Sequence, residues 1–416
     1  MQRSSTARRL VAAAGLAGAL AIALTACGAS GSGGTSPTSA SSGSAAPVSK
    51  GASQVKVTLT GDNGDKCSLS DTSAKAGPVT FTVENQSSTA ITEVELQSQN
   101  RILGEKENLA PGLAPVSFTL TLGGGSYQVY CPGADKEIQN FTVTGKAAAQ
   151  PAGDVQSVLS QGTTGYASYV DGVVVDMVTA TKNLQAAVDS GSLQTAQAKY
   201  ALARPFYEKI ESDVDGFVKP GFKATDNAGN LDYLIDMRAS NLDPSVGWHG
   251  FHAIERDLFQ AKAITPSTKS LAAELTSNVE ELATLSKSLT YKPEDLANGA
   301  AGLLEEVQTE KVTGEEEAFS HYDLIDFAAN VEGAQQAFAF LEPGMKKIDP
   351  ALTTTINTQF TNVNNLLNTF RDPSQPGGFK IYTPQLREQN AATLSHAVQA
   401  LQVPLSTIAE KVATAG

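Results

Sequence analysis

The segments VKVTL (residues 55–59) and VTFTV (residues 79–83) alternate apolar and polar side chains, which is the period of a strand with one buried face. Turn residues separate such runs, as in GDNG at residues 61–64 and AGP at residues 76–78. The pattern extends over residues 54–146. It predicts a small β-sandwich of about seven short strands, the first of two different parts of the chain.

The pattern changes after residue 146. Residues 147–162 are rich in Ala, Gly, Gln and Ser and are expected to form a linker. Over residues 163–416 apolar residues recur at helical spacing, and the first helix is expected at 163–189. Long amphipathic segments with short breaks are typical of antiparallel helix bundles. The chain is therefore predicted to be multidomain, with a β-sandwich followed by an all-α bundle domain.

The N-terminus has the features of an exported lipoprotein. Residues 1–26 read as a signal peptide, because three arginines precede a short apolar run. Leu24-Thr25-Ala26-Cys27 resembles a lipobox, which predicts a lipidated Cys27; ordinary cleavage after Ala26 is the alternative. Residues 27–53 are expected to be a flexible Gly/Ser tether. We expect a lipid-anchored protein of the cell membrane, on its extracytoplasmic face.

Composition favours a metal over a nucleic acid. The chain has 416 residues, 41% of them hydrophobic, and a formal net charge of −13. Such an acidic surface repels phosphate backbones and attracts cations, so nucleic-acid binding is not expected. With 3 cysteines and 4 histidines, sites built on thiolate or imidazole ligands have few candidates.

The β part carries a cysteine in a metal-loop-like hairpin. GSYQVYCPG (residues 125–133) resembles the last hairpin of cupredoxins, but residues 54–145 contain no His or Met, which excludes a blue-copper site. Cys67 and Cys131 are expected to form a disulfide in an oxidising compartment. The alternative is a second metal, such as copper, bound by both cysteines and acids. The candidate acids are Glu93, Glu95, Glu105 and Glu107, foremost Glu95 and Glu105.

The densest candidate site in the helical part is GWHGFHAIER (residues 247–256). His252 and Glu255 are three residues apart, which on a helix places both side chains on one face within reach of one cation. Glu208 and Glu211 have the same spacing and form a plausible opposing ligand set. A site needs four to six donors, so further helices must contribute. The alternative is that these acids form a solvated face and that the histidine is structural.

A third acidic cluster spans residues 305–326. Its spacing ranks no member above the others. Its weaker candidate ligands are Glu315, His321 and Asp323.

These motifs resemble those of a known family. GFHAIE (residues 250–255) looks like the GxHxxE motif of the imelysin family. YEKIE (207–211), GAAGLLEEV (299–307) and GEEE (314–317) are similar to its EfeO branch, and the resemblance covers about residues 54–413.

The resemblance implies a cupredoxin-like domain before an imelysin domain. It also implies an extracytoplasmic component of an iron-uptake system, working with a membrane permease and a dye-decolourising haem peroxidase. Iron binding is then expected at His252 and Glu255, to which we add Glu208 and Glu211.

We therefore expect a protein that captures Fe²⁺ or Fe³⁺ and delivers it to a membrane iron permease, without substrate turnover. The alternative is a metal-dependent enzyme, either a ferrous iron oxidase or an imelysin-type metallopeptidase. A zincin requires HExxH, whereas this motif is HxxE with Arg256 at the position of the second imidazole. Glu208, Glu211, His252 and Glu255 resemble the Glu-x-x-His pairs of di-iron bundles only loosely, because the order of His252 and Glu255 is reversed and the pair is not repeated. A surface adhesin that binds no metal is the third reading.

Overall fold

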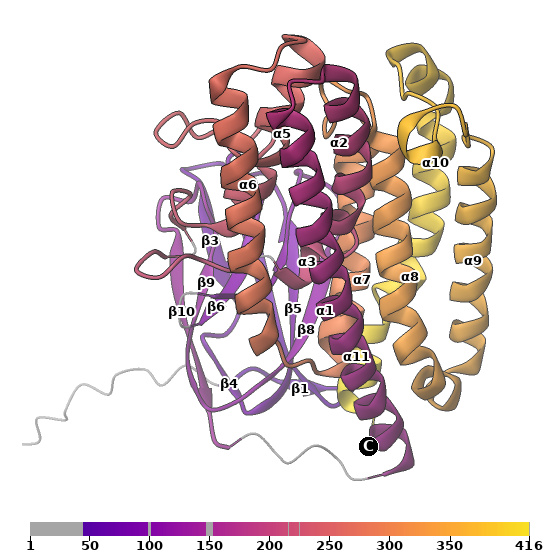
Figure 1. Cartoon of the computed structure of the whole chain (residues 1–416). Coiled ribbons are helices and arrows are strands. Elements are labelled where there is room, and N and C mark those ends of the chain that lie inside the picture. The colour runs from indigo at the N-terminus through magenta and orange to yellow at the C-terminus, as the bar shows by residue number, and fades with distance from the viewer. Residues whose placement is uncertain (1–44, 99–100, 147–152, 215, 224, 416) are drawn as a thin grey trace, which may run out of the picture. The chain divides into compact units, whose positions relative to one another are not determined.

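The computed structural model describes residues 45–98, 101–146, 153–214, 216–223 and 225–415. The predicted signal peptide and Cys27 lie outside these residues, as does most of the predicted tether. Strands and helices of the described residues belong to one compact unit. The strands come first in the chain and the helices follow, as the sequence pattern predicts (Figure 1).

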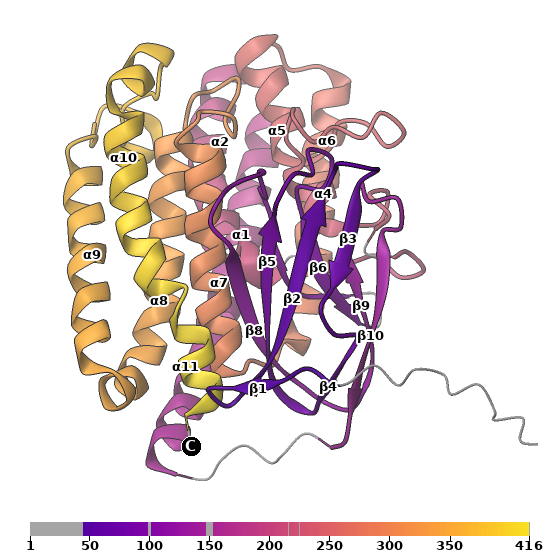
Figure 2. The ribbon, with the colours of Figure 1, turned by 180° about the vertical axis from the view of Figure 1, so that it is seen from behind.

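The first sheet has the strand order β1-β2-β5-β8. β1 pairs with the beginning of β2, and β3 pairs with the end of β2. β2 and β5 run parallel, whereas β8 is antiparallel to β5, with Phe81 opposite Phe118. Figure 2 shows β5, β2 and β3 side by side. The strands are β1 (Val48–Ser49), β2 (Ala52–Thr60), β3 (Lys66–Leu69), β5 (Gly77–Asn85) and β8 (Val116–Leu122).

The second sheet has the order β4-β10-β9-β6-β7. β4 is parallel to β10 and the other pairs are antiparallel. Short strands that alternation alone does not reveal bring the total above the expected seven, because β1, β3 and β4 lie in polar segments. The strands are β4 (Ser73–Lys75), β6 (Val94–Ser98), β7 (Arg101–Lys106), β9 (Gly125–Tyr130) and β10 (Ile138–Thr144).

The two sheets enclose an aromatic core. The ring of Phe81 lies 5.2 Å from Phe118 of its own sheet and 5.2 Å from Phe141 of the other. Cys67 of β3 and Cys131 after β9 are joined by a disulfide, which links the sheets covalently. The disulfide prediction is confirmed. The alternative of two thiolate metal ligands is wrong for this form, because bonded sulfurs are not thiolates.

The helical part begins earlier than predicted: α1 starts at Asp154, inside the expected linker, since Ala, Gln and Ser are compatible with a helix. Two π-helical segments, η1 and η3, directly continue α5 and α7. The α-helices are α1 (Asp154–Asp189), α2 (Leu193–Glu208), α3 (Glu211–Val214), α4 (Leu231–Asp236), α5 (Gly250–Glu255), α6 (Pro266–Leu285), α7 (Pro293–Glu306), α8 (Asp323–Ile348), α9 (Pro350–Asn368), α10 (Pro384–Leu405) and α11 (Ile408–Thr414); the π segments are η1 (Arg256–Gln260) and η3 (Val307–Lys311).

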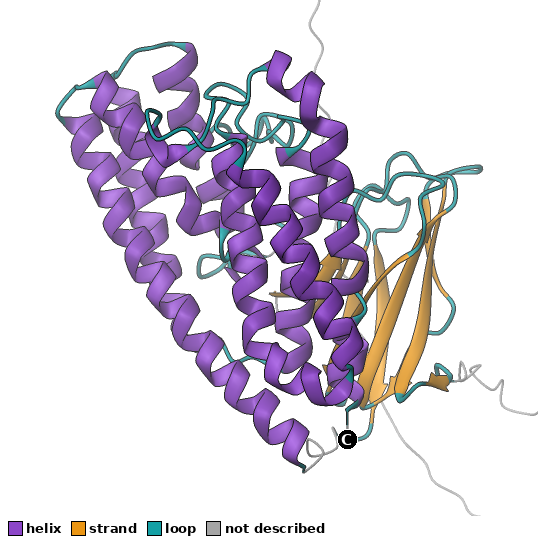
Figure 3. Ribbon diagram, turned by 90° about the vertical axis from the view of Figure 1, so that its right-hand side faces the viewer, coloured by secondary structure: helices purple, strands orange, loops and turns teal. Residues whose placement is uncertain are grey.

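The long helices share one core. α1 packs against α2, α6 and α8, and α7 packs against α8, so the apolar stripes of these helices are buried together. Figure 3 shows the helices gathered on one side and the strands on the other. Among the described residues, no helix combines the length and the apolar character that a membrane span requires.

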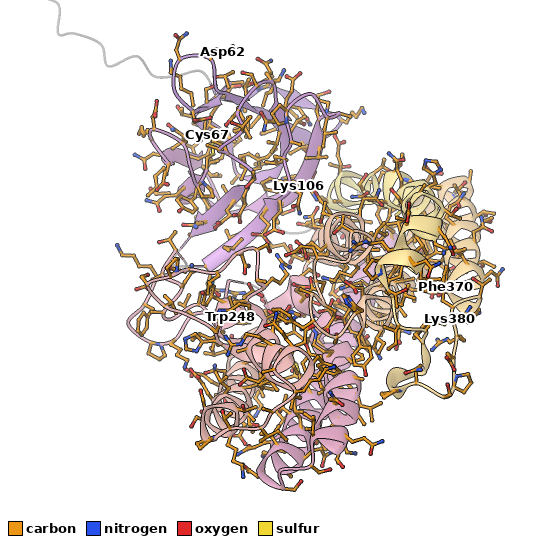
Figure 4. All side chains as sticks on the ribbon, turned by 90° about the horizontal axis from the view of Figure 1, so that it is seen from above. Asp62, Cys67, Lys106, Trp248, Phe370 and Lys380 are labelled. Atoms are coloured by element: carbon orange, nitrogen blue, oxygen red, sulfur yellow. A yellow bond between two sulfur atoms is a disulfide. The ribbon has the colours of Figure 1, made fainter. Side chains whose placement is uncertain are left out.

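Helix α7 joins the two parts of the fold by polar contacts. The Nδ2 of Asn298 donates to the carbonyl of Thr119 at 2.7 Å, and Glu294 Oε1 accepts from the backbone N–H of Thr121 at 3.0 Å. Lys106 Nζ lies 2.6 Å from Glu305 Oε2, at the place where strands meet helices (Figure 4). These contacts position β8 and the end of β7 next to α7.

Candidate metal centre

The first residue of the short helix α5 is Gly250, a position that only glycine can occupy. Its φ is 67°, and a Cβ at this position would collide with the carbonyl oxygen of Ile235. Only glycine tolerates both conditions without strain. The close approach brings the first turn of α5 against the end of α4, so that His252 comes to lie beside Asp236.

His252 is the imidazole of a buried polar cluster and is 1% exposed. Its Nδ1 lies 2.9 Å from Glu255 Oε2, which confirms that the i, i+3 spacing places the two side chains together. Its Nε2 lies 3.3 Å from Glu316 Oε1 and 3.6 Å from Asp236 Oδ1. We call Asp236, His252, Glu255 and Glu316 the buried centre. Three of these groups, from Asp236, His252 and Glu316, have ligand atoms within 4.8 Å of one another.

Both carboxylate oxygens of Glu255 make hydrogen bonds. Oε2 faces His252, while Oε1 accepts the backbone N–H groups of Phe319 at 2.8 Å and Ser320 at 2.7 Å. This is the arrangement of a carboxylate that orients a ligating imidazole and leaves the far nitrogen for the ion. Ligand atoms of His252, Glu255 and Glu317 also lie within 4.8 Å of one another, so Glu255 remains a predicted ligand as well as a candidate orienting group.

Two buried cations balance the acids of the centre, and the sequence analysis missed both. Arg204 Nη2 lies 2.8 Å from Glu316 Oε1, and Lys311 Nζ lies 3.1 Å from Glu316 Oε2. Arg204 also pairs with Asp236 and Glu208. Each cation is 1% exposed. Buried charges of this kind are stable only when paired, so the cations hold the acids in place.

Glu208 and Glu211 lie on the Lys311 side of the centre. Lys311 Nζ is 3.3 Å from Glu208 Oε2 and 3.9 Å from Glu211 Oε2. Ligand atoms of Glu208, Glu316 and Asp326 lie within 4.8 Å of one another, so Glu208 belongs to an all-carboxylate group adjacent to the imidazole. These two acids remain predicted ligands.

The weaker candidates of the third cluster lie around a turn. Asp323 Oδ1 accepts the backbone N–H of Glu317 at 3.2 Å, and Glu317 in turn accepts from the backbone N–H of His321. Glu315 accepts from the hydroxyl of Ser240, and its side chain is 31% exposed. Asp323 and His321 thus shape the turn, whereas the neighbours of Glu315 point inward.

Three acids of the β part lie close together. Ligand atoms of Glu93, Glu105 and Glu107 are within 4.8 Å of one another, and all three side chains are half-buried. Glu95, the other predicted ligand, pairs with Glu105 across β6 and β7 and accepts a hydrogen bond from Gln97. Three of the four candidate acids therefore lie together, while both candidate cysteines are held in the disulfide.

Burial and pairing set the charges at the centre. Burial and Arg204 oppose a charged His252, but hydrogen bonds to Glu255 and Glu316 and the charge of Asp236 raise its pKa well above the usual value. Burial raises the pKa of Asp236 to about 6, although Arg204 lowers it. Burial opposes an ionised Glu316, yet Lys311 and Arg238 hold the pKa of that carboxyl well below its usual range. Glu316 is therefore an anion in the folded protein.

The donor set fits a hard cation. Several buried carboxylate oxygens have no hydrogen-bond partner, which is unusual for buried polar atoms. Carboxylate oxygens with one imidazole suit iron and manganese better than softer ions. Among the described residues, the carboxylate oxygens that accept no hydrogen bond are Glu208 Oε2, Glu211 Oε2, Asp236 Oδ2, Asp323 Oδ2 and Asp326 Oδ1. The first two lie 3.3 and 3.9 Å from Lys311 Nζ.

Comparison with known proteins gives a consistent result. Residues 162–408 match the family described as Imelysin. The chain is 32% identical over 365 residues to "Iron uptake system component EfeO" of Escherichia coli (strain K12), which covers 86% of this chain and 90% of that protein. The protein of the same name from Shigella boydii serotype 4 (strain Sb227) is 33% identical over 334 residues, covering 79% and 84%. An alignment of this length includes part of the β region as well as the helices.

Proposed function

Because the chain belongs to the imelysin family and is EfeO-like over most of its length, we propose that it is an iron-uptake component that captures iron as cargo. The ion binds reversibly at the buried centre and is then passed on. The curated relatives are named as uptake components and not as enzymes, which supports capture over turnover.

One observation carries this proposal: the orientation of His252. Its Nδ1 is held by Glu255, and its Nε2 faces carboxylate oxygens of Asp236 and Glu316. An imidazole fixed at one nitrogen and surrounded by anions at the other is arranged for a cation at the second nitrogen. Arg204 and Lys311 neutralise part of this charge until an ion arrives.

The sequence and the disulfide support an extracytoplasmic, lipid-anchored setting for this function. A lipid on Cys27 keeps the head on the outer face of the membrane, near a membrane iron permease that receives the ion. A dye-decolourising haem peroxidase belongs to the same system. The disulfide between Cys67 and Cys131 supports an oxidising compartment.

The enzyme readings are less well supported by the site. Arg256 stands where HExxH would place its second imidazole, and its guanidinium stacks over Trp248 at 4.8 Å. An oxidase and a binder differ in O₂ consumption when oxygen is added to protein that was loaded with Fe²⁺ anaerobically. A binder consumes O₂ no faster than free Fe²⁺ does.

An equilibrium titration tests the proposal, using anaerobic Fe²⁺ and, separately, Fe³⁺ as a weak chelate. We expect saturable binding that His252→Ala weakens by at least about 100-fold, because the only nitrogen donor of the centre is removed. His249→Ala is the matched control, since His249 pairs with Glu274 at 3.0 Å, outside the centre. Equal binding by the two variants would overturn the assignment, and no binding by the parent chain would favour the enzyme or adhesin readings.

A further inference from the structure

A buried centre needs a route by which the ion arrives. His252 is 1% exposed, Glu316 1% and Asp236 3%, so no ion reaches Nε2 directly from the surface. A usable metal site requires such a path.

A cavity of about 360 Å³ lies between β7 and the helices and extends to the edge of the centre. Its wall includes Glu105 and Glu107 from the β part and Glu306 from α7. Asp236 of the centre and Glu211 of α3 also line it. The cavity therefore connects the acids of the β part with a member of the buried centre.

The innermost wall offers carboxylate oxygens that accept no hydrogen bond. Asp236 is 3% exposed and Glu211 is 8% exposed. The Oδ2 of Asp236 and the Oε2 of Glu211 accept no hydrogen bond, and Lys311 Nζ lies 3.9 Å from Glu211 Oε2. Buried oxygens without donors are costly, so their presence on the cavity wall indicates a ligand that supplies positive charge.

The charge of the wall points to a cation. Among the described residues that line it, nine are acidic, and two, Lys106 and Arg238, are basic. A concave surface with such an excess of one sign raises the local concentration of counter-ions and the rate at which they enter.

The acids form overlapping groups that lead inward. Glu107 belongs to a group with Glu93 and Glu105, and also to a second group with Glu306 and Glu310; in each group the ligand atoms lie within 4.8 Å. Glu306 and Glu310 then share Lys311 and Arg238 with Glu316, the acid beside His252.

We propose that this cavity is the route by which the cation reaches the buried centre, and that Glu107, with Glu306 and Glu310, is its first binding point. The inference rests on the proposed function, since it assumes iron as cargo of the centre. The route takes a bare hard cation and not an organic chelate, because it passes between closely spaced carboxylates.

Gly302 of α7 offers a steric test that changes no charge. It lines the cavity, its backbone is helical, and a Cβ there would lie 3.9 Å from the Cβ of Ser212, an ordinary contact. Gly302→Ala therefore fits and serves as the control. Gly302→Leu extends further into the cavity and narrows it.

The measurement is stopped-flow binding of anaerobic Fe²⁺ to the chain from residue 28 onward, followed by quenching of Trp248, the single tryptophan, which lies just before α5 (Figure 4). We expect Gly302→Leu to slow association and release together by about tenfold, leaving the Kd within about twofold of Gly302→Ala. Glu107→Gln should slow association several-fold, whereas Glu388→Gln, an exposed acid elsewhere on the chain, should not.

Each result decides the matter. Association of Gly302→Leu at the rate of Gly302→Ala would overturn the route while leaving capture at the centre intact. A Kd that rises in proportion to the slower association would also overturn it, because the substitution would then act on the centre itself. Absence of binding by the parent chain would overturn the proposed function together with the route.

Discussion

Replacing Glu255 by glutamine separates an orienting carboxylate from a direct ligand. A glutamine keeps its oxygen on the N–H groups of Phe319 and Ser320, which Glu255 Oε1 holds at 2.8 and 2.7 Å. Its NH₂ then faces His252 Nδ1, which must accept a hydrogen bond instead of donating one. The proton of a neutral imidazole moves to Nε2, where the ion requires a lone pair.

The magnitude follows from this change of tautomer. Restoring the free Nε2 breaks one hydrogen bond to a buried group and leaves two donors facing each other, at a cost of about 1–3 kcal/mol. That corresponds to roughly a 10–100-fold loss of iron affinity, the range typical of orienting partners. Glu316→Gln is expected to weaken binding more, because it removes an anionic oxygen 3.3 Å from Nε2.

The assay is anaerobic calorimetric titration of Fe²⁺ into the parent chain, Glu255→Gln and His252→Ala, with helix content checked by circular dichroism. An intermediate affinity for Glu255→Gln is the expected result. If this variant loses binding as completely as His252→Ala, Glu255 is a direct ligand and the reasoning is wrong. Unchanged affinity would be equally damaging, since the carboxylate would then orient nothing.

Three further predictions concern stability. Gly250→Ala should lower the free energy of unfolding by about 1–3 kcal/mol in urea, because its φ is 67° and its Cβ meets Ile235; a neutral effect would mean that α5 can shift freely. Burial raises the pKa of Asp213 to about 7, above the unfolded value near 3.9, so stability should fall as pH rises from 4 to 7 and then level off. Asp213→Asn should remove roughly 4 kcal/mol of this pH-dependent change, about 1.4 kcal/mol for each unit of pKa shift, in denaturant titrations at several pH values. An unaltered pH dependence would assign the change to other groups. Replacing both Cys67 and Cys131 by alanine should cost about 2–5 kcal/mol, since the bond closes a loop with a sequence separation of 64; thermal melts equal to those of the parent would contradict this.

The local pairing of His252 with Glu255 was accessible from sequence because both lie within one helical turn, where spacing determines which side chains meet. The change from strand to helical period likewise predicted the order of the two parts. Such patterns predict the type of a single helix or strand and the side chains that share one of its faces. They contain no information on which distant elements face each other.

The remaining members of the centre come from such distant elements. Asp236 ends α4, and Glu316 lies in the turn after η3, so no repeat relates them to His252. Glu315, the weaker candidate, is half-buried while its neighbour Glu316 is buried, because a turn does not follow helical periodicity. Arg204 and Lys311 resemble ordinary surface cations in sequence; only the packing shows that each is buried among acids. The available signal is the run EEE at residues 315–317, which gathers three acids within the third acidic cluster.

Helix α7 and its continuation η3 have a consequence for the modularity of this architecture. Near the beginning of α7, Asn298 donates a hydrogen bond to a strand carbonyl, and at the end of η3, Lys311 forms an ion pair with Glu316 of the centre. A lineage that lost the β part would expose the first set of contacts and remove one wall of the acidic cavity. The same helix would then need new surface residues at its beginning. Gain or loss of the β part by domain shuffling should therefore leave a trace in α7 itself, far from the boundary at which the chain was cut.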